Sequence, residues 1–202
     1  MTDTTKIVLS EKELSLVNDA GWFLTKHVII KKVYSLFSDM IPAISSAIKE
    51  NGISLPPELA ASHPRIYKGE NYLQLPYVIL DYPGYFKGEH IFAIRTMFWW
   101  GNFFSITLHL SGKYKSMFEE TLPGNLEKAK YDFFVAIGKD QWQHHFEENN
   151  YLPALLISKE QLKENWNDSN FIKLALKFGL QNWNNTANPI LEGYLKITSL
   201  LR

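Results

Sequence analysis

The run FAIRTMFWWGNFFSITLHLSG, residues 92–112, constrains the fold more than any other part of this chain. Two stretches rich in aromatic and β-branched residues flank Gly101-Asn102, a pattern typical of two antiparallel strands joined by a tight turn. We expect these strands at about Ile91–Trp99 and Phe103–Ser111. The run also holds one arginine and one histidine, so it poses the question of which face of the sheet carries them.

The length of the turn answers that question, because a slip of one residue moves every side chain to the opposite face. A two-residue turn pairs Trp100 with Phe103 and leaves Arg95 alone on an apolar face, which is costly without a buried partner. A three-residue turn pairs Trp99 with Phe103 and separates the two kinds of side chain more cleanly. We favour it for that reason. The apolar face then contains Phe92, Ile94, Phe98, Phe104, Ile106, Leu108 and Leu110, interrupted by Thr96.

The opposite face carries the candidate ligand-binding residues, which are Arg95, Thr107, His109, Trp99 and Phe103. A guanidinium fork, a hydroxyl and an imidazole beside aromatic walls can hold a small anion or a polar ligand head. Asp81, at the end of the preceding predicted strand, is an alternative partner for the arginine. A sheet surface of mixed polarity, open to solvent or covered by a helix, is the non-functional interpretation of the same residues.

Helical patterns lie at both ends of the chain. A capping box at Ser10 and apolar spacing from Trp22 to Ile48 predict N-terminal helices within residues 1–52. Residues 70–138 form the predicted sheet region, and residues 158–202 the predicted C-terminal helices. One of those helices has a face made of Phe171, Leu174, Ala175 and Phe178. The order predicts a single α+β domain over residues 1–202, with a small antiparallel sheet of about four strands packed against helices from both ends.

Composition removes several classes of function. Lysine plus arginine and aspartate plus glutamate number 21 each, so nothing indicates the basic surplus of a nucleic-acid-binding protein. There is no cysteine, which excludes thiol catalysis and cysteine-ligated zinc and fits a reducing compartment. The sequence shows neither a secretion signal nor an apolar run long enough to cross a membrane. We therefore expect a cytoplasmic protein that binds neither nucleic acid nor membrane.

The run GKDQWQHHFEENN, residues 138–150, is the second dense group of polar residues. His144 and His145 lie beside acidic residues, but adjacent side chains point apart in a helix or a strand, and no zinc-site spacing is present. We predict a polar surface turn here, without a metal. The chain also lacks the glycine-rich and nucleophile-elbow motifs, so no cofactor is expected. An enzyme would have to use His109 or the pair His144 and His145.

The segment LPYVILDYP…IFAIRTMFWWGNFFSITLHLSG, about Leu75 to Gly112, resembles a segment of small, uncharacterised bacterial proteins with no assigned activity. That resemblance implies a bacterial, intracellular protein and transfers no catalytic residue. Three functions stay open on the residues alone. They are an interaction or scaffold protein that forms a homo-oligomer through exposed aromatics, a module binding a small anionic ligand at the face of Arg95 and His109, and an enzyme.

Overall fold

The computed structural model describes residues 7–50, 52, 55–129 and 132–202. It shows an α+β fold built on a seven-stranded antiparallel sheet of order β1-β2-β3-β4-β7-β5-β6. The strands are β1 (Arg65–Tyr72), β2 (Leu75–Lys87), β3 (His90–Trp99), β4 (Phe103–Ser111), β5 (Phe134–Ala136), β6 (Tyr151–Pro153) and β7 (Phe171–Gly179). The α-helices are α1 (Glu11–Asn18), α2 (Ala20–Glu50), α3 (Pro57–Ala60), α4 (Lys113–Phe118), α5 (Leu122–Ala129), α6 (Lys159–Asn167) and α7 (Ala187–Ser199). The 3-10 helices are η1 (Ala154–Leu156) and η2 (Leu180–Asn185).

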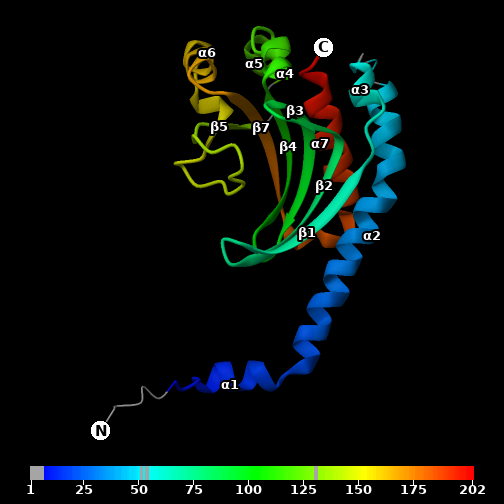
Figure 1. Ribbon diagram of the computed structural model, residues 1–202, viewed down its shortest axis with the longest axis vertical. Coiled ribbons are helices and arrows are strands. Elements are labelled where there is room, and N and C mark those ends of the chain that lie inside the picture. Colours follow the sequence, from blue (N-terminus) through cyan, green and yellow to red (C-terminus); the bar gives the residue numbers. More distant parts are fainter. Residues whose placement is uncertain (1–6, 51, 53–54, 130–131) are drawn as a thin grey trace.

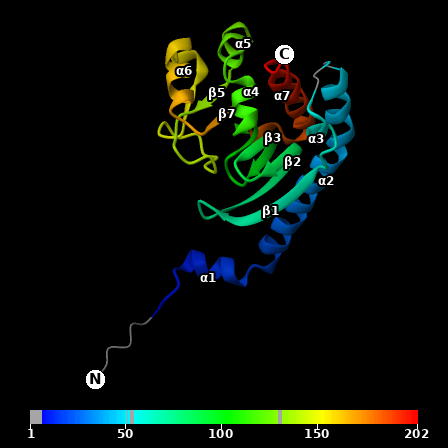
Figure 2. The same cartoon turned by 45° about the horizontal axis from the view of Figure 1, so that its top comes forward.

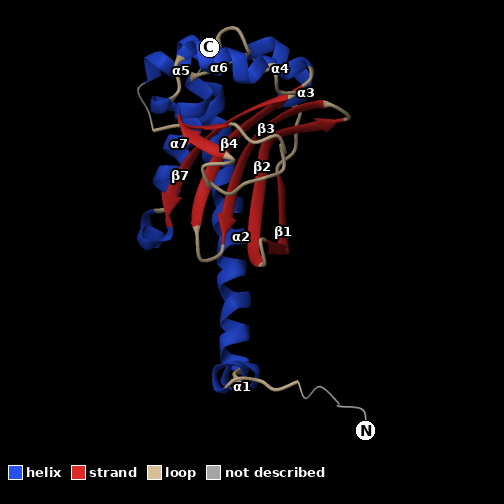
Figure 3. Ribbon diagram, turned by 90° about the vertical axis from the view of Figure 1, so that its left-hand side faces the viewer, coloured by secondary structure: helices blue, strands red, loops and turns tan. Residues whose placement is uncertain are grey.

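Helices from both ends of the chain cover one face of the sheet, as the sequence predicts. In Figure 1 α2 and α7 run side by side on the right-hand side of the sheet, while α4, α5 and α6 gather at one end of the sheet. Gly193 lets α7 approach β4 closely, because a Cβ added there would lie 2.4 Å from Cδ1 of Ile106. The opposite face is covered by the irregular segment between β5 and β6, which Figure 3 shows in front of the strands.

The register between β3 and β4 confirms the three-residue turn. Trp99 pairs with Phe103, and Arg95 pairs with Thr107. Gly101 has a φ of 72°, in the left-handed region that favours glycine. The side chains predicted for the core, Ile94, Phe98, Ile106 and Leu108, are all buried beneath α2 and α7. Thr96 interrupts this face without an unpaired hydroxyl, since it donates to Tyr194 of α7 at 3.1 Å.

The sheet is larger than the four strands predicted from sequence. The chain from Arg65 to Tyr72, most of which precedes the predicted sheet region of residues 70–138, pairs with β2 as β1. The predicted helix with a face through Phe171 and Phe178 is wrong, because Phe171–Gly179 is strand β7, paired along its length with β4. Six consecutive residues of β7 are buried, from Phe171 to Leu176. A strand covered on both faces loses the polar alternation that marks a strand in sequence, and its apolar spacing also fits a helix.

The N-terminal helices are present, with the predicted capping box at Ser10 and Glu13. Residues 1–6 and 51 of that predicted region lie outside the described residues. Helix α2 is continuous from Ala20 to Glu50 and contains Pro42 in its interior. None of the described helices combines the length and the apolar character needed to cross a membrane.

Candidate functional site

All five predicted ligand-binding residues lie on the face of the sheet opposite α2 and α7. This face is covered by residues 137–150, which we call the cover loop. The exposed fractions are 6% for Arg95, 5% for Thr107, 2% for His109, 6% for Trp99 and 8% for Phe103. The run expected to be a polar surface turn is irregular and partly exposed, as predicted, and its inner side also covers polar groups of the sheet. Arg95, His109 and Phe103 contact the cover loop. Trp99 packs against Tyr72 of β1 and against Phe103.

Arg95 is held by a fixed carboxylate. Its Nε donates to one oxygen of Asp81 at 2.7 Å, and one terminal nitrogen donates to the other oxygen at 2.9 Å. Tyr67 closes a ring, since its hydroxyl accepts from Arg95 at 2.9 Å and donates to Asp81 at 3.1 Å. A bidentate pair of this kind is strong and directional. The pairing with Asp81 considered from the sequence is thus confirmed.

His144 fixes the cover loop to this ion pair. The second terminal nitrogen of Arg95 lies 3.2 Å from Nε2 of His144, and the arginine must be the donor because a guanidinium has no acceptor. The ring therefore carries no proton on Nε2 in this contact. Burial and then the charges of Lys173 and Arg95 place the pKa of His144 well below its ordinary value. Tyr72 of β1 adds a second attachment, because its hydroxyl accepts from the backbone N–H groups of His144 (2.6 Å) and His145 (2.9 Å).

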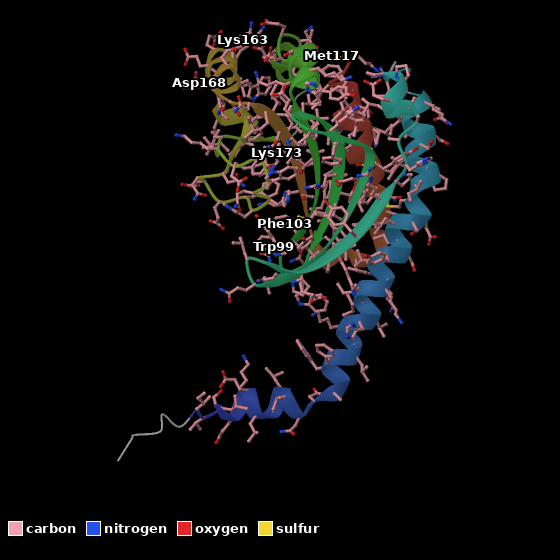
Figure 4. The ribbon with its side chains drawn as sticks, viewed as in Figure 1. Trp99, Phe103, Met117, Lys163, Asp168 and Lys173 are labelled. Carbon is pink, nitrogen blue, oxygen red and sulfur yellow. The ribbon has the colours of Figure 1, made fainter. Side chains whose placement is uncertain are left out.

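His109 and Lys173 are direct partners in the β4–β7 ladder, and both contact Gln141 of the cover loop. Nε2 of His109 lies 2.9 Å from Oε1 of Gln141, and Nζ of Lys173 donates to the backbone oxygens of Gln141 (3.0 Å) and Gln143. Figure 4 places Lys173 between the strands and this loop. Burial, followed by the charge of Lys173, lowers the pKa of His109 to about 3. Burial, followed by the charge of Arg95, lowers the pKa of Lys173 to about 7.

Aromatic side chains make the remaining contacts between the cover loop and the sheet. Phe146 of the cover loop stacks on Tyr151 with ring centroids 4.6 Å apart and meets Phe103 edge-on at 5.0 Å. Trp142, which is 47% exposed, lies over Arg95 and contacts the ring of His109 edge-on. Packing of this kind holds the loop on the sheet and keeps water from most of the polar groups beneath it.

A cavity of about 620 Å³ borders the first half of the cover loop. It is lined by residues 137–142 of the loop, together with Asn165 and residues 168–171 between α6 and β7. Gln141 is one of the lining residues, so the same side chain that contacts His109 also borders the cavity. Asp140 lines it too, and its hydrogen bond from the N–H of Trp142 lowers the pKa of its carboxyl group.

His145 does not join this network through its ring. Its Nδ1 accepts a long hydrogen bond, 3.4 Å, from the N–H of Glu147 in the same loop. Within the ranges that the structure describes, no group of three histidine or acidic side chains is placed to hold a metal ion. His109 and His144, which the sequence singled out separately, are brought under the same loop.

Three important members of the network escaped the sequence analysis: Lys173, Tyr67 and Gln141. A signal existed for the first, because Lys173 interrupts the apolar run FIKLALKFG. A lysine in such a run is either at the surface or buried with acceptors. Tyr67 and Gln141 lie in polar segments whose placement depends on contacts far away in the chain, and nothing local marks them.

A second candidate region lies at the other end of the molecule. Residues 7–28, which we call the N-terminal arm, comprise α1, the first turns of α2 and the residues flanking α1. Figures 1 and 2 show them extending away from the sheet. No residue of α1 is buried, and the first buried residue of α2 is Ile30. Its large apolar side chains that remain exposed are Ile7, Val8, Leu9, Leu14, Leu16, Val17, Trp22, Phe23, Leu24 and Val28.

Comparison with known proteins assigns neither region a function. No family model, no curated protein and no solved structure matches this chain. A function must therefore be argued from the chemistry of the cover-loop network and of the N-terminal arm.

Proposed function

We propose that this protein acts through protein–protein contact and that the N-terminal arm joins two copies of the chain into a homodimer. The observation that carries the proposal is the exposure of ten large apolar side chains in residues 7–28, each 43–95% exposed. Their combined exposed surface is on the order of 1,000 Å². A standard interface buries about 800 Å² per partner, so this arm is large enough to form one.

The apolar stripe of α2 continues past the end of the sheet. Phe23 precedes the buried Ile30 by seven residues, and Trp22 precedes the buried Val33 by eleven. At 3.6 residues per turn both intervals are close to a whole number of turns, so the four side chains share one side of the helix. Helix α2 therefore presents to solvent the same kind of surface that it buries further along. That continuity favours a partner that covers the stripe where the sheet does not.

Charge along the arm and the adjoining turns of α2, up to residue 38, favours a second copy as that partner. The segment from Ser10 to Asp19 contains Glu11, Glu13 and Asp19 against one lysine. The next nineteen residues, 20–38, contain Lys26, Lys31 and Lys32 and no acidic residue. In a twofold-symmetric contact each surface meets its own copy, so two arms that cross in opposite directions bring the acidic part of each against the basic part of the other. Two arms that lie side by side in the same direction would place the acidic part of one against the acidic part of the other, and the basic part against the basic part.

The mass in solution tests the proposal directly. Sedimentation equilibrium should give twice the chain mass of 23.4 kDa for the wild type, and the double variant Leu24→Glu/Val28→Glu should give the monomer mass. The matched control is Leu155→Glu/Leu156→Glu, which places the same two charges on side chains 75% and 73% exposed outside the arm. The control should stay dimeric. A wild type that is monomeric at every concentration, or a control that dissociates as readily as the arm variant, would contradict the proposal.

Charge reversal and vesicles supply two further checks. Lys31→Glu/Lys32→Glu should weaken dimerisation at least about tenfold, because each change counts twice in a symmetric dimer, and Glu11→Lys added to it should restore part of the loss.

Aromatic and basic residues on one helix also suit an anionic lipid surface. A monomeric protein that co-sediments with anionic vesicles, and loses this in Leu24→Glu/Val28→Glu, would assign the arm to a membrane and overturn the homodimer.

A further inference from the structure

One residue of the cover loop supplies acceptors to two donors on the sheet. Gln141 places its side-chain oxygen 2.9 Å from Nε2 of His109 and its backbone oxygen 3.0 Å from Nζ of Lys173. The two donors belong to adjacent strands and are direct cross-strand partners. Two oxygen atoms of one residue thus bind two neighbouring nitrogen donors. A single carboxylate group likewise offers two acceptor oxygens to a pair of donors.

The acceptors that Lys173 has in this arrangement are neutral. Its side chain is buried, with 1% of the residue exposed, and its hydrogen bonds go to backbone oxygens of Gln141 and Gln143. Within the described part of the chain Lys173 makes no ion pair. The buried carboxylate on this face, Asp81, is committed to Arg95 through both oxygens. A buried ammonium facing dipoles alone keeps part of its desolvation cost, which an anion would offset.

Gln141 also borders open space. It is among the residues that line the cavity of about 620 Å³, and its side-chain oxygen contacts His109. Shortening this one side chain would connect the cavity with the imidazole, while the remainder of the loop stays anchored through Tyr72 and Phe146. A small molecule in the cavity could therefore reach Lys173 and His109 by replacing one residue's contacts.

We infer that Lys173 and His109 form a binding site for the carboxylate group of a small molecule that occupies this cavity, and that Gln141 takes the place of that carboxylate when the site is empty. Asp140 and Asp168 line the same cavity and repel a dianion more than a monoanion, so a carboxylate is favoured over phosphate. The inference is independent of the homodimer, because it concerns the opposite region of the molecule.

The substitution of Gln141 tests this directly by calorimetric titration with acetate. Gln141→Ala should bind acetate about tenfold more tightly than the wild type, because the side-chain oxygen that competes for His109 is removed, while the backbone oxygens near Lys173 are the same in both. Gln141→Glu should not bind it, because the new carboxylate is tethered at the site. Lys173→Met should lose binding, whereas Lys177→Met should bind like the wild type. Lys177 is the matched control, since it lies on the same strand and the same side but is exposed.

Proton uptake distinguishes a contact with Lys173 from adsorption elsewhere. A bound anion favours the charged ammonium, so titrations near pH 7.5 in buffers of different ionisation enthalpy should show protons taken up on binding. Equal acetate affinity in the wild type, Gln141→Ala and Gln141→Glu would overturn the inference, and these three variants decide it even if Lys173→Met does not fold. Absence of acetate binding by Gln141→Ala would also overturn it. Tighter binding of inorganic phosphate than of acetate would overturn the carboxylate assignment.

Discussion

Arg95 and Asp81 face each other across the β2–β3 ladder and are joined by two hydrogen bonds, of 2.7 and 2.9 Å. The exposed fractions of the two residues are 6% and 2%, so neither charge is well solvated. Such a pair adds less to stability than its Coulomb attraction suggests, because both ions have lost their hydration. Removing one partner strongly lowers the stability of the fold, because the other charge is then left buried and unpaired.

Arg95→Ala should therefore lower the free energy of unfolding by about 3–5 kcal/mol. Denaturation by urea, followed by circular dichroism, measures this change. The control is Arg65→Ala on β1, where the side chain is exposed and the expected change is within about 0.5 kcal/mol. A loss below about 1 kcal/mol for Arg95→Ala would mean that the ion pair does not behave as buried.

Leu108→Ala should destabilise the protein by about 2–5 kcal/mol, because the side chain is fully buried between the sheet and its helices and would leave a cavity. Leu155→Ala provides the comparison, since that leucine is 75% exposed and should change stability by less than about 0.5 kcal/mol. The same denaturation experiment measures both. A similar loss in the two variants would contradict the assignment of Leu108 to the core.

The hairpin was predictable because its sequence carries two independent constraints. Alternation along the two strands separates apolar from polar side chains cleanly in one register alone, and Gly101 and Asn102 allow the turn that this register needs. Strand β7 offered neither constraint. Both of its faces are covered, so Leu174 and Ala175, which point to opposite sides, are equally apolar and equally compatible with a helix.

Long-range placement accounts for what else the sequence left out. The cover loop contains no regular secondary structure, and its polar composition is typical of a surface turn. It lies against the sheet because donors of Lys173, His109 and Arg95 match its acceptors, a relationship that joins segments about thirty to fifty residues apart. The arm illustrates the reverse case. Apolar spacing predicted a helix correctly, but spacing alone does not say how far along α2 the sheet extends to cover it.

The pH dependence of stability gives a specific test of the environment of Lys173. Its pKa is lowered to about 7 in the folded protein, by burial first and by the charge of Arg95 second, from an ordinary value of 10.5. Between these two values the unfolded chain binds this proton and the folded chain does not, so the contribution of Lys173 to stability should rise with pH, by about 1.4 kcal/mol per unit. Below pH 7 both states hold the proton and the contribution should be constant.

The difference in unfolding free energy between the wild type and Lys173→Met isolates this contribution, because other titrating groups cancel. Urea denaturation from pH 5 to 10 should give a difference that is flat up to about pH 7 and then rises in favour of the wild type. Lys177→Met, in which an exposed lysine of the same strand is replaced, should give a difference that is flat throughout. Parallel curves for the wild type and Lys173→Met across the whole range would show that the ammonium of Lys173 titrates as a solvated lysine does, and that the cover loop does not seal it from water.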